Sequence, residues 1–234
     1  MHRAAGCFDA YLHPQRDHPG TNYAIPRDGC APGPDDVTAL VGAFASAHRL
    51  PRLEYLEATA PAAEATLLAA GFELELRTSV MTCTPATLQA APSPARVERL
   101  SAISDPAVVR ALVHAQQRAF GDEPDPDEHG LLRLPFAVAA WIREEVVGGG
   151  MALEVIADTT ELVGIAVLEP HRRQGIAGAI TAELTRMAFE AGAASVFLTP
   201  GDAGAQRVYA RAGFADTGDV MLHLRRPTPA APGR

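Results

Sequence analysis

The segment Arg172–Gly178 (RRQGIAG) is the feature that most constrains how this chain folds. It follows the apolar run Leu162–Leu168 and opens a segment with helical spacing, so the sequence predicts a strand, a small-residue turn and a helix in succession. At such a turn Gly175 lets the backbone approach a ligand closely, and the unpaired N–H groups of the first helical turn point toward it. Arg172 and Arg173 add positive charge and forked donors. The segment therefore predicts an α/β fold with a phosphate site at this turn.

The composition is that of a folded protein without a basic surface. The 234 residues are 47% hydrophobic and 21% charged, which suits one large domain or two small ones. The net charge of −8 argues against binding nucleic acid, although it is compatible with a cationic substrate. The N-terminus lacks the apolar core of a signal peptide, and no apolar run reaches membrane-spanning length. We therefore expect a cytoplasmic protein that does not enter a membrane.

The cysteines give a second indication of the compartment. Cys7, Cys30 and Cys83 are widely spaced and form no C-x-x-C pair. This pattern predicts neither a disulfide framework nor a zinc site, so no metal is expected and a reducing location is the simplest interpretation.

A Pro- and Ala-rich stretch, residues 84–95, divides the chain. We interpret it as a linker between an N-terminal lobe, 1–83, and a second domain, 96–226, which a disordered tail, 227–234, follows. In the lobe, residues 13–36 are rich in Pro, Gly, Asp and His and are expected to be irregular. The remaining lobe elements are predicted as helices over 36–48 and 61–70 and strands over 53–56 and 72–83.

The second domain shows alternating strand and helix patterns. Its first helix is expected to run from Asp105, as N-cap, to Phe120, with Pro106 in the first turn. Around it we predict strands over 96–100, 136–143, 146–156, 161–168, 194–199 and 220–224, with helices over 175–191 and 203–212. Residues 131–134 are the candidate for one more short helix.

Three features around the phosphate turn resemble the GCN5-related N-acetyltransferase (GNAT) family. The strand reads ELVGIAV from Glu161, the turn reads RRQGIA from Arg172, and Tyr209 precedes a Gly-Phe pair. The predicted order of elements over 96–226 is also similar to that of the family. The resemblance implies a mixed central sheet flanked by helices, with acetyl-CoA as co-substrate and an amine as acceptor.

In the strand, the resemblance gives Glu161 the role of the base that takes a proton from the amine. A carboxylate in an apolar strand is desolvated, which raises its pKa toward that use; the alternative is a glutamate at the strand end in water. The backbone of Ile165, Ala166 and Val167 would meet the pantetheine arm and the oxyanion, because in the family this strand separates from its neighbour. Gly164 would ease that distortion.

In the turn, the resemblance assigns the pyrophosphate to seven residues: Arg172, Arg173, Gln174, Gly175, Ile176, Ala177 and Gly178. The turn is not a Walker loop, because no Gly-Lys-Ser/Thr follows, and it is not a dinucleotide-binding G-x-G-x-x-G. The other glycine-rich site, Gly148–Gly150, is expected to be a bulge or turn of the hairpin and a poor phosphate site.

In the last helix, Tyr209 is the candidate acid that protonates the leaving thiolate. The alternative is a core aromatic residue on an amphipathic helix. The family pattern has Asn where this chain has Asp202, so the amide donor that contacts the cofactor is lost and the contact at Asp202 is in doubt.

Two further segments bear on the acceptor and the lobe. The acidic loop Asp122–Glu128 is expected either to attract a cationic acceptor or to be simply solvated. Residues 53–72 resemble 195–214, each with a strand, a turn, a helix and Ala-Gly-Phe, which suggests that the lobe is a degenerate GNAT-like half-domain. A common junction between helix and strand is the alternative explanation.

The sequence as a whole predicts an acetyl-CoA-dependent N-acetyltransferase that acts by direct transfer in a ternary complex, because no Cys or Ser in the motifs resembles an activated nucleophile. The alternatives are a non-catalytic acyl-CoA-binding or interaction protein on the same fold, and an acyltransferase with a hydroxyl acceptor. We expect the acceptor to be a small-molecule or peptide amine. Dimers are frequent in the family, so a homodimer is implied unless the lobe replaces that contact.

Overall fold

The computed structural model describes residues 1–17, 19–101, 104–123 and 135–227, which form two compact units. Unit 1 comprises Met1–Ser79 and the residues from Gly218 onward, and unit 2 comprises Val80–Thr217. The chain therefore passes between the units inside two strands, β5 (Glu73–Cys83) and β11 (Ala215–Arg225). The expected helix at 131–134 lies outside the described residues, and so does the expected tail, 227–234, apart from residue 227.

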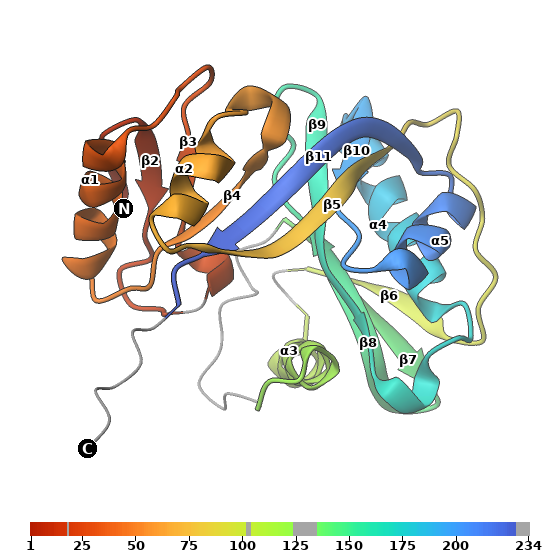
Figure 1. The fold of residues 1–234 in the computed structure, drawn as a ribbon. Coiled ribbons are helices and arrows are strands. Elements are labelled where there is room, and N and C mark those ends of the chain that lie inside the picture. The colour runs from red at the N-terminus through yellow and green to blue at the C-terminus, as the bar shows by residue number, and fades with distance from the viewer. Residues whose placement is uncertain (18, 102–103, 124–134, 228–234) are drawn as a thin grey trace. The chain divides into compact units, whose positions relative to one another are not determined.

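Unit 2 is a mixed sheet with helices on both faces, as predicted (Figure 1). Its strands lie in the order β6–β7–β8–β9–β10–β5, and the β9–β10 pair is parallel whereas the other pairs are antiparallel. The elements are β6 (Arg96–Leu100), α3 (Pro106–Phe120), β7 (Phe136–Ile142), β8 (Glu145–Ala152), β9 (Thr159–Val167), α4 (Ile176–Glu190), β10 (Ser195–Leu198) and α5 (Ala203–Arg211).

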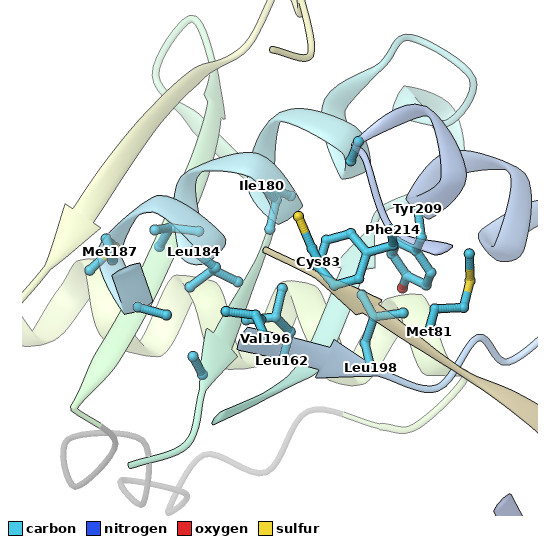
Figure 2. Packing of buried hydrophobic residues seen from close by; sticks show 14 of the residues in the cluster. Met81, Cys83, Leu162, Ile180, Leu184, Met187, Val196, Leu198, Tyr209 and Phe214 are labelled. Atoms are coloured by element: carbon cyan, nitrogen blue, oxygen red, sulfur yellow. The ribbon is translucent and has the colours of Figure 1, made fainter. Parts of the chain in front are cut away.

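Alternate residues of β7 show how the two faces are covered, because successive strand residues point to opposite sides. Ala137 and Ala139 pack with Leu112 of α3, whereas Val138 and Ala140 pack with Leu184 of α4. Figure 2 shows the second cluster, in which Ile180, Leu184 and Met187 of α4 lie over Leu162, Val196 and Leu198 of the sheet. We refer to these sides as the α3 face and the α4 face.

The predicted N-terminal cap of α3 is confirmed. The Asp105 carboxylate accepts a hydrogen bond of 2.8 Å from the Ala107 N–H, and Pro106 occupies the first turn. Gly121 ends the helix at a φ of 92°, a conformation that glycine adopts without a steric penalty.

Unit 1 is a smaller sheet in the order β1–β2–β3–β4–β11, with α1 and α2 packed on it. Its elements are β1 (His2–Ala5), β2 (Phe8–Tyr11), β3 (Tyr23–Pro26), α1 (Pro34–Ala45), β4 (Arg52–Leu56) and α2 (Ala63–Ala69). The core contains Phe8, Leu40, Phe44, Leu53 and Leu67, all fully buried. Residues 23–26 were expected to be irregular; they form β3 because pairing with β2 overrides the turn-rich local sequence.

Most of the last strand belongs to a different unit from the domain in which the sequence placed it. The sequence placed residues 220–224 with the second domain, but β11 pairs antiparallel with β4 of unit 1. In unit 2 the neighbour of β10 is instead β5, which comes from the N-terminal part of the chain. The two strand–helix–strand segments, β4–α2–β5 and β10–α5–β11, therefore exchange their third elements.

The resemblance between these segments extends further in structure than in sequence. Each is preceded by a strand and a helix, β3–α1 and β9–α4, and the pairs β3–β4 and β9–β10 are both parallel. The antiparallel strands β1 and β2 occupy the places that β7 and β8 have in unit 2. The elements β1 to β5 thus repeat the order of β7 to β11, without counterparts of β6 and α3.

The segment 84–95 packs within unit 2. The Gln89 N–H donates to the Ala212 carbonyl at 3.0 Å, at the end of α5. Farther along, a Cβ atom on Gly175 would lie 2.7 Å from the Pro92 carbonyl oxygen, so the segment passes directly over the start of α4. We refer to residues 84–95 as the α4 strap.

One expectation about the cysteines is wrong. Cys7 and Cys30 form a disulfide with their Cα atoms 6.2 Å apart, and Cys83 is free and buried. The cysteines meet because the Arg27 N–H bonds to the Cys7 carbonyl, which brings two distant turns together and leaves no local spacing signal. The bridge removes cysteine usage as support for a reducing location.

Candidate functional site

The site predicted from the sequence centres on the end of β9. The parallel ladder between β9 and β10 has three pairs and ends at Glu161 and Phe197. On its other edge, β9 stays paired with β8 as far as Val167. The six residues from Leu162 to Val167 therefore continue without β10, which agrees with the expected separation of the two strands and includes Ile165, Ala166 and Val167.

The expected distortion of β9 lies at Gly164. This residue has a φ of 62°, and the β8–β9 register shifts between the pairs Gly149–Ala166 and Met151–Val163. Gly150 thus faces both Gly164 and Ile165, which is a β-bulge. The Gly148–Gly150 run was expected to be a bulge or turn of the hairpin; instead, these glycines pair in regular register with Ala140, Ala139 and Val138 of β7, and the extra residue of the bulge lies in β9, opposite Gly150.

The turn after β9 has the backbone of an anion site. Arg173 and Gly175 have φ values of 62° and 79°, and Gly175 is the N-cap of α4. The first intrahelical hydrogen bond of α4 runs from the Ala179 N–H to the Gly175 carbonyl. The N–H groups of Ile176, Ala177 and Gly178 precede it, so they point out of the helix N-terminus, where the helix dipole also favours an anion.

The two arginines of this turn differ in what they contact. The Arg172 guanidinium donates to the carbonyls of Val167 and Ala119, at 3.0 and 2.9 Å, and so ties the turn to the ends of β9 and α3. Arg173 is exposed, as is Gln174, whose amide lies 3.5 Å from the Pro170 carbonyl. Arg173 is therefore the better source of charge for a phosphate, and Arg172 holds the turn in place.

Glu161 is the last residue of β9 that pairs with β10, and it lies three residues before Gly164 of the bulge. Its carbonyl accepts a hydrogen bond of 2.9 Å from the Leu153 N–H, and its side chain is half-buried. Because the neighbouring Leu162 is buried on the α4 face, the Glu161 side chain belongs to the α3 face.

Tyr209 lies on the opposite face. It is only 8% exposed in the α4-face core, with its ring 6.4 Å from that of Phe214 (Figure 2). Burial, and secondarily the charge of Asp202, raises the pKa of Tyr209 to about 12. The phenol therefore stays protonated throughout the neutral and mildly alkaline range, as a proton donor requires.

The side chain of Asp202 forms hydrogen bonds to the backbone of its own helix. Its carboxylate accepts hydrogen bonds from the N–H groups of Gly204 and Ala205, at 2.6 and 2.8 Å, and so caps α5. These bonds hold its pKa below the usual range. The carboxylate thus occupies helix-end donors that a ligand anion would otherwise use.

Sequence reasoning missed one polar residue beside the bulge. Gln116 is 6% exposed, and its side-chain amide donates to the Gly164 carbonyl at 2.6 Å. The available signal was that Gln116 falls four residues after Leu112 on the apolar stripe of α3. Of the acidic loop Asp122–Glu128, all but Asp122 and Glu123 lies outside the described residues.

The described residues contain no cluster of three or more His, Cys, Asp or Glu placed to hold a metal ion. Among the helices that the structure describes, none is both long and apolar enough to cross a membrane.

Comparison with known proteins shows which family the second unit is similar to. Residues 106–214 match the model of the "Acetyltransferase (GNAT) family". A GCN5-related N-acetyltransferase from Kribbella flavida superimposes with a TM-score of 0.78 at 25% identity, over 97% of this chain and 90% of that one. The search of curated proteins returned no significant match.

Two more distant structures share the fold. A GCN5-related N-acetyltransferase from Sphaerobacter thermophilus has a TM-score of 0.64 at 20% identity, over 94% of this chain and 78% of that one. A tandem GNAT protein from the clavulanic acid biosynthesis pathway has a TM-score of 0.58 at 10% identity, over 97% and 79%.

Proposed function

Residues 106–214 belong to the GNAT family of N-acetyltransferases, and from this premise we propose that the protein transfers an acetyl or short acyl group from acetyl-CoA to an amine. The observation that carries the proposal is the combination of two backbone features. The β9–β10 ladder ends at Glu161, and the strand then leads into a left-handed Gly175 at the start of α4. Peptide groups of one short segment are thus presented both to a pantetheine arm and to a pyrophosphate.

The residues of the turn would hold the pyrophosphate mainly through backbone. The N–H groups of Ile176, Ala177 and Gly178 supply donors, and Gly175 adopts the left-handed conformation from which α4 starts. Arg173 supplies charge from the exposed side, with Gln174 beside it, whereas Arg172 fixes the turn. Asp202 acts as a cap for α5 in this scheme, beside the anion and not in contact with it.

The acyl transfer would use one group from each face of the sheet. The amine nitrogen forms a bond to the thioester carbonyl carbon while Glu161 accepts the proton that the nitrogen loses. The bond from carbon to sulfur then breaks, and Tyr209 donates its phenolic proton to the leaving sulfur. Transfer of the proton from Glu161 to Tyr209 through water restores both groups, so the chemistry balances without a covalent enzyme adduct.

Glu161 and Tyr209 can act on the same substrate only at a point where the sheet is open, so that groups from both of its faces have access to the substrate. Glu161 belongs to the α3 face and Tyr209 to the α4 face, and the ladder between β9 and β10 ends beside Glu161. In this proposal a thioester lies along Ile165–Val167, so that one carboxylate and one phenol on opposite faces would serve one site.

The test combines binding and turnover. We expect acetyl-CoA to bind with micromolar affinity by calorimetry, and CoA release to rise when a polyamine, an aminoglycoside or a peptide with a free amino end is added. Glu161→Gln should retain acetyl-CoA affinity, lower kcat by about 10²- to 10⁴-fold and lose the acidic limb of the pH–rate profile.

Each failure has a distinct meaning. Absence of acetyl-CoA binding by a folded wild type would refute the proposal. Binding without turnover by any amine would favour a non-catalytic acyl-CoA-binding protein, and release that depends on added alcohols would point to a hydroxyl acceptor.

A further inference from the structure

Gln116 makes an interaction that packing alone does not require. It lies on α3, is 6% exposed, and donates its side-chain amide to the Gly164 carbonyl at 2.6 Å. A buried glutamine is stable only where its polar atoms find partners. The partner here is not in the same helix but in the backbone of β9, 48 residues away.

The Gly164 carbonyl needs a donor because of the bulge. Gly164 and Ile165 together face Gly150, so a regular ladder with β8 is interrupted at this point. An unpaired carbonyl under a helix would carry the desolvation cost of a lost hydrogen bond. Gln116 supplies the missing donor.

The local sequence lets α3 come close enough for this contact. A Cβ atom at Gly164 would lie 2.9 Å from the Gln116 amide nitrogen and equally close to the Met151 methyl group. A Cβ atom at Gly149, on the adjacent strand, would collide with the Leu112 side chain one turn earlier on α3. Because Gly149 and Gly164 lack a Cβ atom, two successive turns of α3 can pack closely against two adjacent strands.

The contact fixes the direction of a neighbouring N–H group. The Gly164 carbonyl and the Ile165 N–H belong to one planar trans peptide, in which the two groups point in opposite directions. When Gln116 holds the carbonyl toward α3, the Ile165 N–H is held away from it, in the part of β9 that β10 no longer pairs.

We propose that Gln116 is a positioning residue for acyl transfer, which orients the Ile165 N–H to stabilise the oxyanion that forms from the thioester carbonyl. The inference rests on the proposed function. Gln116 touches neither the substrate nor a reacting atom; it acts through the Gly164–Ile165 peptide. Such preorganised donors are effective because they do not have to reorient during the reaction.

The first test separates this role from a structural one. In Gln116→Leu, which keeps the volume but removes the donor, kcat with an amine found in the screen should fall about ten- to hundredfold, because one oriented donor is lost. The KM for acetyl-CoA should change less than about twofold, since the pyrophosphate site is untouched. Gln117→Leu makes the same chemical change one position along α3 and should keep kcat within about twofold of wild type.

The second test uses the isosteric variant Gln116→Glu. Burial of the new carboxyl raises its pKa, and only its protonated form can donate to the Gly164 carbonyl. The ratio of its kcat to that of wild type should therefore rise as the pH falls, and it should be lowest in alkaline solution. Gln116→Leu should show no such trend in the same ratio.

The outcomes distinguish the inference from the function it rests on. An active wild type together with a folded Gln116→Leu of unchanged kcat, or with a Gln116→Glu ratio independent of pH, would overturn the positioning role and leave the proposed function intact. If Gln116→Leu lowers kcat, acetyl-CoA affinity and the melting temperature together, Gln116 has a purely structural role. A wild type that neither binds acetyl-CoA nor releases CoA would overturn both.

Discussion

At the scale of single residues, the environment of Tyr209 sets its protonation over the working pH range. Burial raises its pKa to about 12, so the phenol does not ionise near neutral pH. The folded state therefore holds this proton more tightly than the unfolded state, in which a tyrosine ionises near pH 10. The resulting contribution to stability is complete below about pH 10 and is lost as the pH rises toward about 12.

Tyr209→Phe should lower kcat by about 10²-fold or more while acetyl-CoA affinity changes less than about twofold, because the ring packing is kept and only the acid is lost. Chemical unfolding at a series of pH values should show that the wild type loses more stability than the variant between pH 10 and 12. Equal kcat in the two proteins would remove Tyr209 from the mechanism.

The motif residues were predictable and their partners were not. Glu161, Gly175 and Tyr209 stand in local patterns that the sequence displays directly. The contacts of Gln116 with Gly164 and of Arg172 with Ala119 join segments 48 and 53 residues apart, so no local spacing encodes them. Arg172 illustrates the limit: its motif position was clear, but its side chain binds carbonyls of the protein.

At the scale of elements, α4 offers glycines at both ends for a matched comparison. Gly175 and Gly192 both have left-handed φ values, of 79° and 98°. A Cβ atom at Gly175 would press on the Pro92 carbonyl oxygen of the α4 strap, whereas a Cβ atom at Gly192 would have no heavy atom of the described residues beyond its own chain neighbours within 4 Å. Only the first position combines backbone strain with a close approach at a candidate anion site.

Gly175→Ala should therefore lower acetyl-CoA affinity at least about tenfold and destabilise the protein by about 1–3 kcal/mol. Gly192→Ala should cost about 1 kcal/mol through φ alone and leave acetyl-CoA affinity unchanged. Calorimetry and thermal unfolding of both variants check this. Equal affinity losses in the two would mean that helix stability, and not the anion site, controls binding.

The elements themselves were predicted where the pattern was long. The helix 105–120, the hairpin and the strand–turn–helix at Gly175 follow their sequence signals closely. The four-residue strands β1, β2 and β3 escaped because they are too short to establish an alternation, and their stability comes from mutual pairing. The pairing of β11 with β4 was also missed. The sequence of a strand indicates which of its faces is buried, but not which strand pairs with its edge.

At the scale of the whole molecule, the Cys7–Cys30 bridge stabilises the part of the fold with the smaller core. The bridge closes a loop across a sequence separation of 23 residues, which lowers the entropy of the unfolded chain and is worth about 3 kcal/mol by chain-entropy arguments. Unit 1 should therefore respond more strongly to its loss than unit 2, whose only cysteine, Cys83, is buried and free.

The paired variant Cys7→Ser/Cys30→Ser should unfold unit 1 at lower denaturant while acetyl-CoA binding by unit 2 persists. Alkylation of the denatured, unreduced wild type followed by mass spectrometry should modify Cys83 alone. Modification of all three cysteines in protein kept under oxidising conditions would show that the bridge does not form.

The exchange of β5 and β11 sets the order in which the chain can complete its two units as it leaves the ribosome. In unit 2, β5 is synthesised long before β10, so β10 can pair with β5 as soon as it emerges. Unit 1 has β4 early but must wait for residues 215–225 to cover that strand. The unit that is synthesised first is thus completed last. A premature stop after residue 214 would remove β11 and so leave the N-terminal unit without its last strand.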